Sequence, residues 1–148
     1  SVENVVTVLR KMGIPTSDFD IHVNFPGGTP VDGPSAGIAI ATGIFSAIRE
    51  VKISNKVAMT GELGIHGTVK PIGGVVAKVE AAIQAGAETV IIPKENEQAI
   101  LKELGDVNII PVTTIEEVFD IALLQEKEKE EEEVIPASGA VSSPAASV

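Results

Sequence analysis

From Lys56 onward, short apolar runs of strand-like composition alternate with longer runs of helical periodicity, and this order constrains the fold more than any other feature. The strand-like runs lie at 56–60, 89–92 and 107–110. Helical patterns are expected over about 74–85, 95–104 and 115–124, the last opened by Thr114 with Glu117 as a capping box. Because strands that alternate with helices usually pair in parallel, the order predicts a parallel βαβ portion.

The first half of the chain is less regular and is expected to be mixed or antiparallel. An opening helix, ended by Gly13 and Pro15, is predicted from apolar residues at helical spacing: Val2, Val5, Val6, Leu9 and Met12. The segment 20–24 (DIHVN) alternates like a strand, and a second helix is expected to begin at or near Ser35. The glycines and Pro71 in GELGIHGTVKPIGG indicate a hairpin or a folded-back loop. The whole is therefore expected to be an α/β or α+β domain.

Length and composition fit a single domain with an aliphatic core. The chain has 148 residues, and we expect the domain over 1–125, followed over 126–148 by an acidic run and a disordered Ala/Ser/Pro-rich tail. There is no cysteine, which excludes a disulfide framework, a thiolate zinc site and a cysteine nucleophile. The net charge of -10 argues against nucleic acid as the main partner.

The sequence carries no sign of membrane insertion or export. No apolar run approaches the roughly 20 residues that span a bilayer, and the N-terminal segment lacks the order of a signal peptide. We therefore expect a cytoplasmic protein, with membrane association through upstream elements as the alternative. The start at Ser1, without Met, predicts a fragment of a longer polypeptide.

The loop PVDGPSAG at 30–37 delivers the hydroxyl of Ser35 to the first turn of a helix. The free backbone N–H groups of a first helical turn and the positive end of the helix dipole stabilise an anion, including the oxyanion of a tetrahedral intermediate. The backbone that would form this site belongs to Gly33, Pro34, Ser35 and Ala36. Serine is also a preferred N-cap, so the position taken alone favours a structural role.

A serine nucleophile needs a base, and the chain offers two kinds. The only histidines are His22 and His66, and neither has a spacing that marks it as a base. The other known arrangement pairs serine with lysine, and Lys78 lies among apolar residues in GGVVAKVEAAIQA. An apolar setting disfavours the charged amine, and a neutral amine can accept the serine proton. Taken alone, a lysine on an amphipathic helix is more often a solvated side chain.

Three further residues are candidates for supporting roles. Thr60, at the end of a predicted strand, is placed to hydrogen-bond to the lysine amine and orient it, although ordinary strand packing explains it as well. Asp32 and Glu62 are loop acids that could tune the local charge. The chain contains neither a GxxxxGK[ST] phosphate loop nor an HExxH metal motif, so no cofactor is expected in this domain.

Together these segments closely resemble the protease domain of the Lon family over about residues 2–124. The resemblance is carried by FPGGTPVDGPSAG around Ser35, by AMTGELGIHGTVKPIGGVVAKVEAA over 58–82, and by AGAETVIIPKEN over 85–96. One of these motifs alone is weak evidence, but DGPSAG followed by TGE and then PIGG with the lysine is specific.

The resemblance implies a serine endopeptidase with a Ser35–Lys78 dyad, in which Thr60 lies near the lysine and Asp32 and Glu62 occupy acidic motif positions. It implies an α/β fold of the kind shared with a domain of ribosomal protein S5. It also implies a hexameric ring, unfolded proteins as substrates, and an AAA+ ATPase module in the same polypeptide. ATP and Mg would be used only by that module, which these residues do not contain.

The sequence departs from many bacterial members of the family just before the serine motif. Those members have a longer loop with two histidines, whereas this chain has the shorter FPGGTP loop, a single His22, and Asn24 at the second position. The loop resembles a less common branch, sometimes membrane-associated through elements outside this domain.

Two alternatives of another class are a phosphate- or nucleotide-binding domain and an inactive structural domain of the same fold. A glycine-rich loop that enters a helix N-terminus also binds phosphate, and small-molecule kinases of a related fold use such a loop. PSAG is short for that purpose. Lys78 discriminates between the two functions, because a phosphate site needs a charged lysine and a general base a neutral one.

Overall fold

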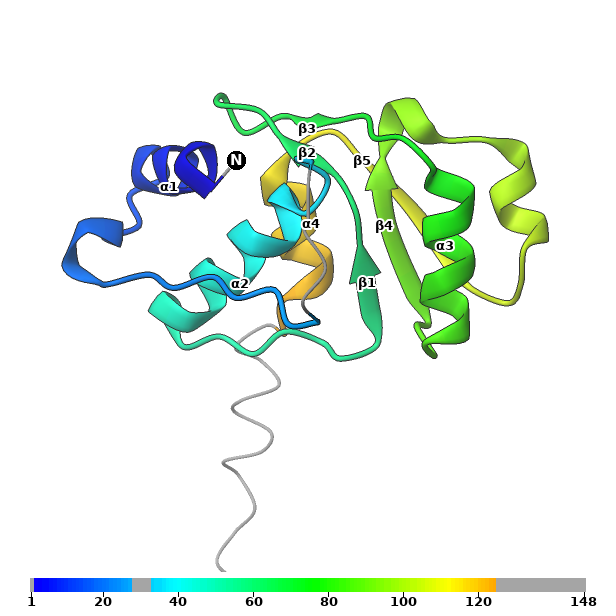
Figure 1. Ribbon diagram of the computed structural model, residues 1–148, viewed down its shortest axis with the longest axis horizontal. Helices are drawn as coiled ribbons and strands as arrows, with labels where there is room; N and C mark the ends of the chain where they lie inside the picture. Colours follow the sequence, from blue (N-terminus) through cyan, green and yellow to red (C-terminus); the bar gives the residue numbers. More distant parts are fainter. Residues whose placement is uncertain (1, 28–32, 125–148) are drawn as a thin grey trace, which may run out of the picture.

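The computed structural model describes residues 2–27 and 33–124, which form a three-stranded parallel sheet with helices on both faces (Figure 1). The strands are β1 (Val57–Met59), β4 (Thr89–Pro93) and β5 (Asn108–Val112). Their order in space is β1-β4-β5, and both pairings are parallel, with Ala58 beside Val90 and Val90 beside Ile109. The parallel βαβ portion and the mixed α/β class are thus confirmed.

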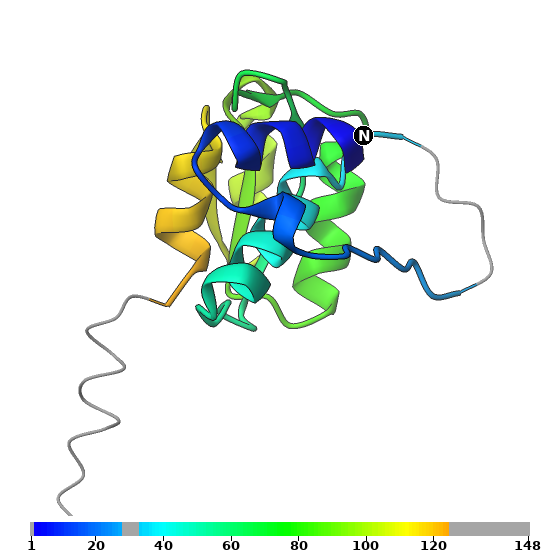
Figure 2. The ribbon, with the colours of Figure 1, turned by 90° about the vertical axis from the view of Figure 1, so that its left-hand side faces the viewer.

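The helices divide between the two faces of this sheet. α2 (Gly37–Arg49) and α4 (Ile115–Ala122) lie on one side and α3 (Val75–Gln84) on the other, while α1 (Val2–Lys11) packs against α2 (Figures 1 and 2). β4, the central strand, is buried on both faces. Its Ile91 joins the core formed by α1, α2 and α4, whereas Val90 and Ile92 join the core under α3. Alternation of side chains along one strand therefore builds two cores.

A small hairpin lies near the carboxyl end of β1, as the glycine-rich sequence there predicts. β2 (Glu62–Leu63) and β3 (Val69–Lys70) pair antiparallel. Backbone hydrogen bonds from Val69 N to Thr113 O (2.8 Å) and from Ile115 N to Gly67 O (2.9 Å) attach the hairpin to the start of α4. The expected cap of α4 is confirmed, since the Thr114 side chain accepts a hydrogen bond from Glu117 N.

The strand predicted at 20–24 is wrong. After the short 3-10 helix η1 (Thr16–Asp18), this segment has no strand pairing and runs along α2. The side chain of Val23 within the segment is exposed, as are those of Phe19 and Phe25 on either side of it. A strand requires the backbone groups of a neighbouring strand, which alternation in one segment cannot supply.

The α-helix predicted over 95–104 is also wrong in type. Two short 3-10 helices occupy this region, η2 (Lys94–Asn96) and η3 (Ala99–Glu103). Glu97 and Gln98 between them are extended, with ψ of 125° and 142°, and this break interrupts any helical ladder. The spacing of apolar residues predicted which side chain is buried, since Leu101 is buried. It did not predict the type of helix.

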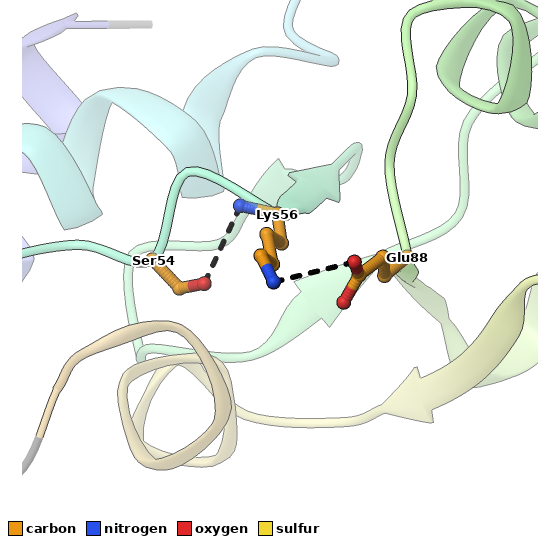
Figure 3. A network of polar contacts seen from close by, with 3 residues as sticks. All are labelled: Ser54, Lys56 and Glu88. Carbon is orange, nitrogen blue, oxygen red and sulfur yellow. Dashed lines mark hydrogen bonds and ion pairs between the residues drawn. The ribbon is translucent and has the colours of Figure 1, made fainter.

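An exposed ion pair and an exposed side-chain hydrogen bond lie at the amino ends of β1 and β4. Lys56 Nζ lies 3.4 Å from Glu88 Oε1, and Lys56 N donates to Ser54 Oγ at 3.4 Å (Figure 3). Exposed ion pairs of this kind contribute little to stability. No helix within the described residues is long and apolar enough to cross a bilayer. The acidic run and tail predicted over 126–148 lie outside the described residues.

Candidate active site

Ser35 lies in the turn that leads into α2, and this turn is held by the residues that follow β1. Gly61 N donates to Ser35 O at 2.9 Å, and Ile38 N donates in return to Gly61 O at 3.2 Å. The N-cap of α2 is Ala36, with no side-chain cap hydrogen bond. Ser35 is therefore not the N-cap, and the structural role that its position suggested is not the one the fold gives it.

The glycine that follows the serine turn permits the close approach of α2 to the hairpin. A Cβ at Gly37 would lie 2.8 Å from Leu63 N and 3.2 Å from Leu63 Cβ. Because the nearest atom belongs to the backbone, it cannot move aside as the tip of a side chain can. The absence of a side chain at Gly37 thus allows the serine turn to lie this close to β2.

The backbone around Ser35 offers fewer donors than the sequence analysis proposed. Pro34 has no N–H, so it can shape the turn but cannot donate to an oxyanion. Its carbonyl accepts from Gly37 N at 3.0 Å. The N–H groups of Ser35 and Ala36 make no hydrogen bond to another backbone group among the described residues. Gly33 has a φ of +108°, which turns the chain toward them. Pro34 is thus excluded as a donor, and the N–H groups of Ser35 and Ala36 are the two candidates next to the start of α2.

Lys78 lies one turn into α3, on the other side of β1 from α2, with Lys78 N bonded to Gly74 O at 3.1 Å (Figure 1). It is half-buried and lines the same pocket as Ser35, a hollow of about 310 Å³. The rest of the lining consists of Thr60 and small or apolar side chains: Ala36, Ala39, Ala58, Met59, Ala81, Ala82 and Val90. Among these residues Lys78 carries the only ionisable side chain. The fold therefore brings Ser35 and Lys78 to one pocket, although no hydrogen bond between described residues joins their side chains.

Thr60 lies in this pocket, but its hydroxyl has a different partner from the expected one. The side chain is buried, and Oγ1 donates to Ser35 O at 3.4 Å rather than to the lysine amine. Thr60 N donates to Ile91 O at 3.1 Å, which extends the pairing of β1 with β4 by one residue. Thr60 thus links the serine turn to the central strand.

The remaining candidates among the described residues lie apart from the pocket. Glu62 is in β2 opposite Lys70, and it does not line the pocket. His66 is exposed in the turn of the hairpin. His22 lines a separate hollow of about 410 Å³ between residues 19–24 and α2. This hollow shares no lining residue with the pocket that holds Ser35. Neither histidine therefore lines the pocket that holds Ser35. Asp32 lies outside the described residues.

Sequence reasoning missed Asn96 as a member of this region. Its side-chain amide makes two hydrogen bonds to the backbone of Ile72, in the segment that leads into α3. The only signal was the place of Asn96 at the end of the AGAETVIIPKEN segment. Within 2–27 and 33–124, no group of three or more His, Asp or Glu side chains is placed to hold a metal ion.

Comparison with known proteins gives a consistent answer over nearly all the described residues. The family model of the Lon protease (S16) C-terminal proteolytic domain matches residues 3–125. "Lon protease 2" of Bacillus subtilis (strain 168) is 63% identical over 124 residues, which are 84% of this chain and 22% of that protein. An "Archaeal Lon protease" of Thermoplasma acidophilum is 46% identical over 135 residues, 88% of this chain and 20% of that protein. The "Lon protease" of Vibrio parahaemolyticus is 44% identical over 136 residues, 83% of this chain and 17% of that protein.

The chain thus spans about a fifth of the length of these relatives. Its motifs, its α/β fold and the match over residues 3–125 agree. The chain belongs to the family of Lon protease (S16) C-terminal proteolytic domains.

Proposed function

We propose that this domain is a serine endopeptidase in which Ser35 is the nucleophile and Lys78 is the general base. One observation carries the proposal: Ser35 and Lys78, from different elements, line one pocket of about 310 Å³ whose other walls are small or apolar. The family supports hydrolysis of peptide bonds over phosphate binding or an inactive structural role.

The proposed reaction follows acyl-enzyme chemistry. A neutral Lys78 Nζ takes the proton of Ser35 Oγ, and Oγ attacks the carbonyl carbon of the scissile peptide bond. The tetrahedral oxyanion accepts hydrogen bonds from the N–H groups of Ser35 and Ala36 at the positive end of α2. The Lys78 ammonium then gives its proton to the leaving amine. Water attacks the acyl-enzyme, again with Lys78 as base, and Ser35 is regenerated.

The lining of the pocket agrees with this assignment of roles. The described lining residues include no carboxylate that would pair with the Lys78 amine. The reaction requires a lysine that accepts the proton of a serine hydroxyl, a role that lysine fills in Ser-Lys enzymes.

Predictions about the whole protein follow from the family resemblance. We propose unfolded proteins or peptides as substrates, a hexameric ring as the assembly, and a cytoplasmic location. ATP and Mg are proposed to act only in an AAA+ module of the same polypeptide, and the proteolytic domain itself is proposed to need no cofactor. Asp32 and Glu62 are proposed to tune the local charge around the site.

Substitution of Lys78 by arginine tests the proposed base. A guanidinium stays protonated, so Lys78→Arg keeps the positive charge and removes the base. We expect cleavage of a fluorogenic peptide to fall by at least about 100-fold, the lower end of what a general base contributes. Lys102→Arg, at an exposed lysine in η3, is the matched control and is expected to keep wild-type activity. A Lys78→Arg protein that cleaves as fast as the control would refute the assignment of Lys78.

A further inference from the structure

We infer that Asn96 is a positioning residue for Lys78, through the segment from which α3 begins. Ile72 N donates to Asn96 Oδ1 at 2.8 Å, and Asn96 Nδ2 donates to Ile72 O at 2.9 Å. The amide thus binds both backbone groups of one residue, much as a neighbouring strand would. Two bonds in opposite senses fix the orientation of the Ile72 backbone as well as its distance. The inference rests on the proposed function, because it assigns Asn96 a role through the proposed base.

The start of α3 has few other polar restraints. Its N-cap is Gly74, in the left-handed region with a φ of +68°, and no side chain caps the helix. The buried contacts of α3 are apolar: Val75 and Val79 pack in the core with Val90, Ile92 and Leu101. Apolar contacts hold a helix against a sheet but set its position along its own axis less sharply than hydrogen bonds do. The pair of bonds at Ile72 provides such a restraint just before the helix that carries Lys78.

Both halves of the proposed dyad are tied to β4. On one side, Thr60 N bonds to Ile91 O and Thr60 Oγ1 bonds to Ser35 O. On the other side, η2 begins directly after Pro93 at the end of β4, and its Asn96 holds Ile72. Both connections thus lead to the same strand, β4. The relative position of Ser35 and Lys78 therefore depends on Asn96 as well as on Thr60.

The chemistry of the contact requires a primary amide. Only asparagine and glutamine offer a donor and an acceptor in one planar group, and the two bonds at Ile72 use one of each. An aspartate keeps the acceptor for Ile72 N but turns a carboxylate oxygen toward Ile72 O. The extended backbone of Glu97 and Gln98 ends η2 directly after Asn96. The helix therefore stops at the residue whose side chain binds Ile72.

The test compares Asn96→Ala and Asn96→Asp with wild type in the full chain, by kcat and KM for a fluorogenic peptide. Measurements are made at a temperature where circular dichroism shows every variant folded. A shift of the reacting groups by about 1 Å can cost about 100-fold in rate. We expect kcat to fall at least 10-fold in both variants while KM stays within about 2-fold. Asn96→Gln, which keeps donor and acceptor on a longer side chain, is expected to lose less kcat than Asn96→Ala.

Thr114→Ala is the matched control for stability, because it removes the cap of α4 and leaves the contact at Ile72 intact. It is expected to keep wild-type kcat and KM. If folded Asn96→Ala or Asn96→Asp keeps wild-type kcat, or if Thr114→Ala loses as much kcat as they do, the positioning role is refuted. If Asn96→Ala does not fold, the decision rests on Asn96→Asp and Asn96→Gln. Lys78→Ala and Ser35→Ala are measured beside them: activity in those variants refutes the proposed function, whereas their inactivity with an active Asn96→Ala refutes only the role of Asn96.

Discussion

At the scale of single residues, Gly37 shows how a missing side chain positions the proposed nucleophile. The first turn of α2 approaches the backbone of Leu63 so closely that a Cβ at Gly37 would lie 2.8 Å from Leu63 N. The same turn is bonded to Gly61 through Ser35 O and Ile38 N. The serine turn, α2 and β2 thus pack tightly together. Close packing explains why the last residue of DGPSAG, Gly37, has no side chain.

Gly37→Ala is expected to destabilise the protein by about 1–3 kcal/mol, the usual cost of overpacking, and to lower peptide cleavage by displacing Ser35. Gly43 provides the control within the same helix, since a Cβ there meets nothing within 4 Å. Gly43→Ala is expected to raise stability by up to about 1 kcal/mol through helix propensity. Urea denaturation of both variants measures the difference. Equal stabilities for the two would show that the close approach at Gly37 has no energetic consequence.

Single residues also show which parts of the site were readable from the sequence. The motifs directed attention to Ser35 and Lys78, and the fold places both in one pocket. The partner of Thr60 was not readable, because it depends on how the serine turn folds back onto the end of β1. Asn96 was missed for a similar reason, since its two bonds join segments that only the tertiary fold brings together.

At the scale of elements, periodicity predicted the positions of most helices and strands. The helices α1, α2 and α3 and the three parallel strands lie close to their predicted positions. The two errors concern segments in which the side-chain pattern does not match the backbone hydrogen bonding. The segment 20–24 lacks the partner strand that would make it a strand, and 95–104 is broken where Asn96 binds Ile72.

The cap of α4 gives a prediction about pH. The hydrogen bond from the Thr113 hydroxyl, at 2.7 Å, is the main cause that lowers the pKa of Glu117 below its usual 4.5. Since the folded pKa lies below the unfolded one, the Glu117 carboxylate contributes its full stability above pH 4.5 and loses it as the pH falls through the folded pKa. Glu117→Gln removes this titration. The excess in melting temperature of wild type over Glu117→Gln is therefore expected to shrink between pH 6 and pH 3, and a constant difference would contradict the assignment.

At the scale of the whole molecule, the pocket lies where the two cores meet. Ser35 lines the pocket on the side of α2, whose core includes Ile38 and Ile91. Lys78 lines it on the side of α3, whose core includes Val79 and Val90. A sheet with helices on both faces therefore unites residues from distant parts of the chain at the carboxyl end of β1. The chain spans 22% of the length of the Bacillus relative.

The most direct test of the central claim is covalent labelling of the nucleophile. The protein is treated with a serine-directed peptide aryl phosphonate, and the adduct is mapped by mass spectrometry after digestion. We predict one adduct, on Ser35, which disappears in Ser35→Ala, persists in Ser54→Ala, and forms at least about 100-fold more slowly in Lys78→Arg because the base is lost. An adduct on another residue, or labelling of Ser35 at an undiminished rate in Lys78→Arg, would contradict the Ser35–Lys78 mechanism.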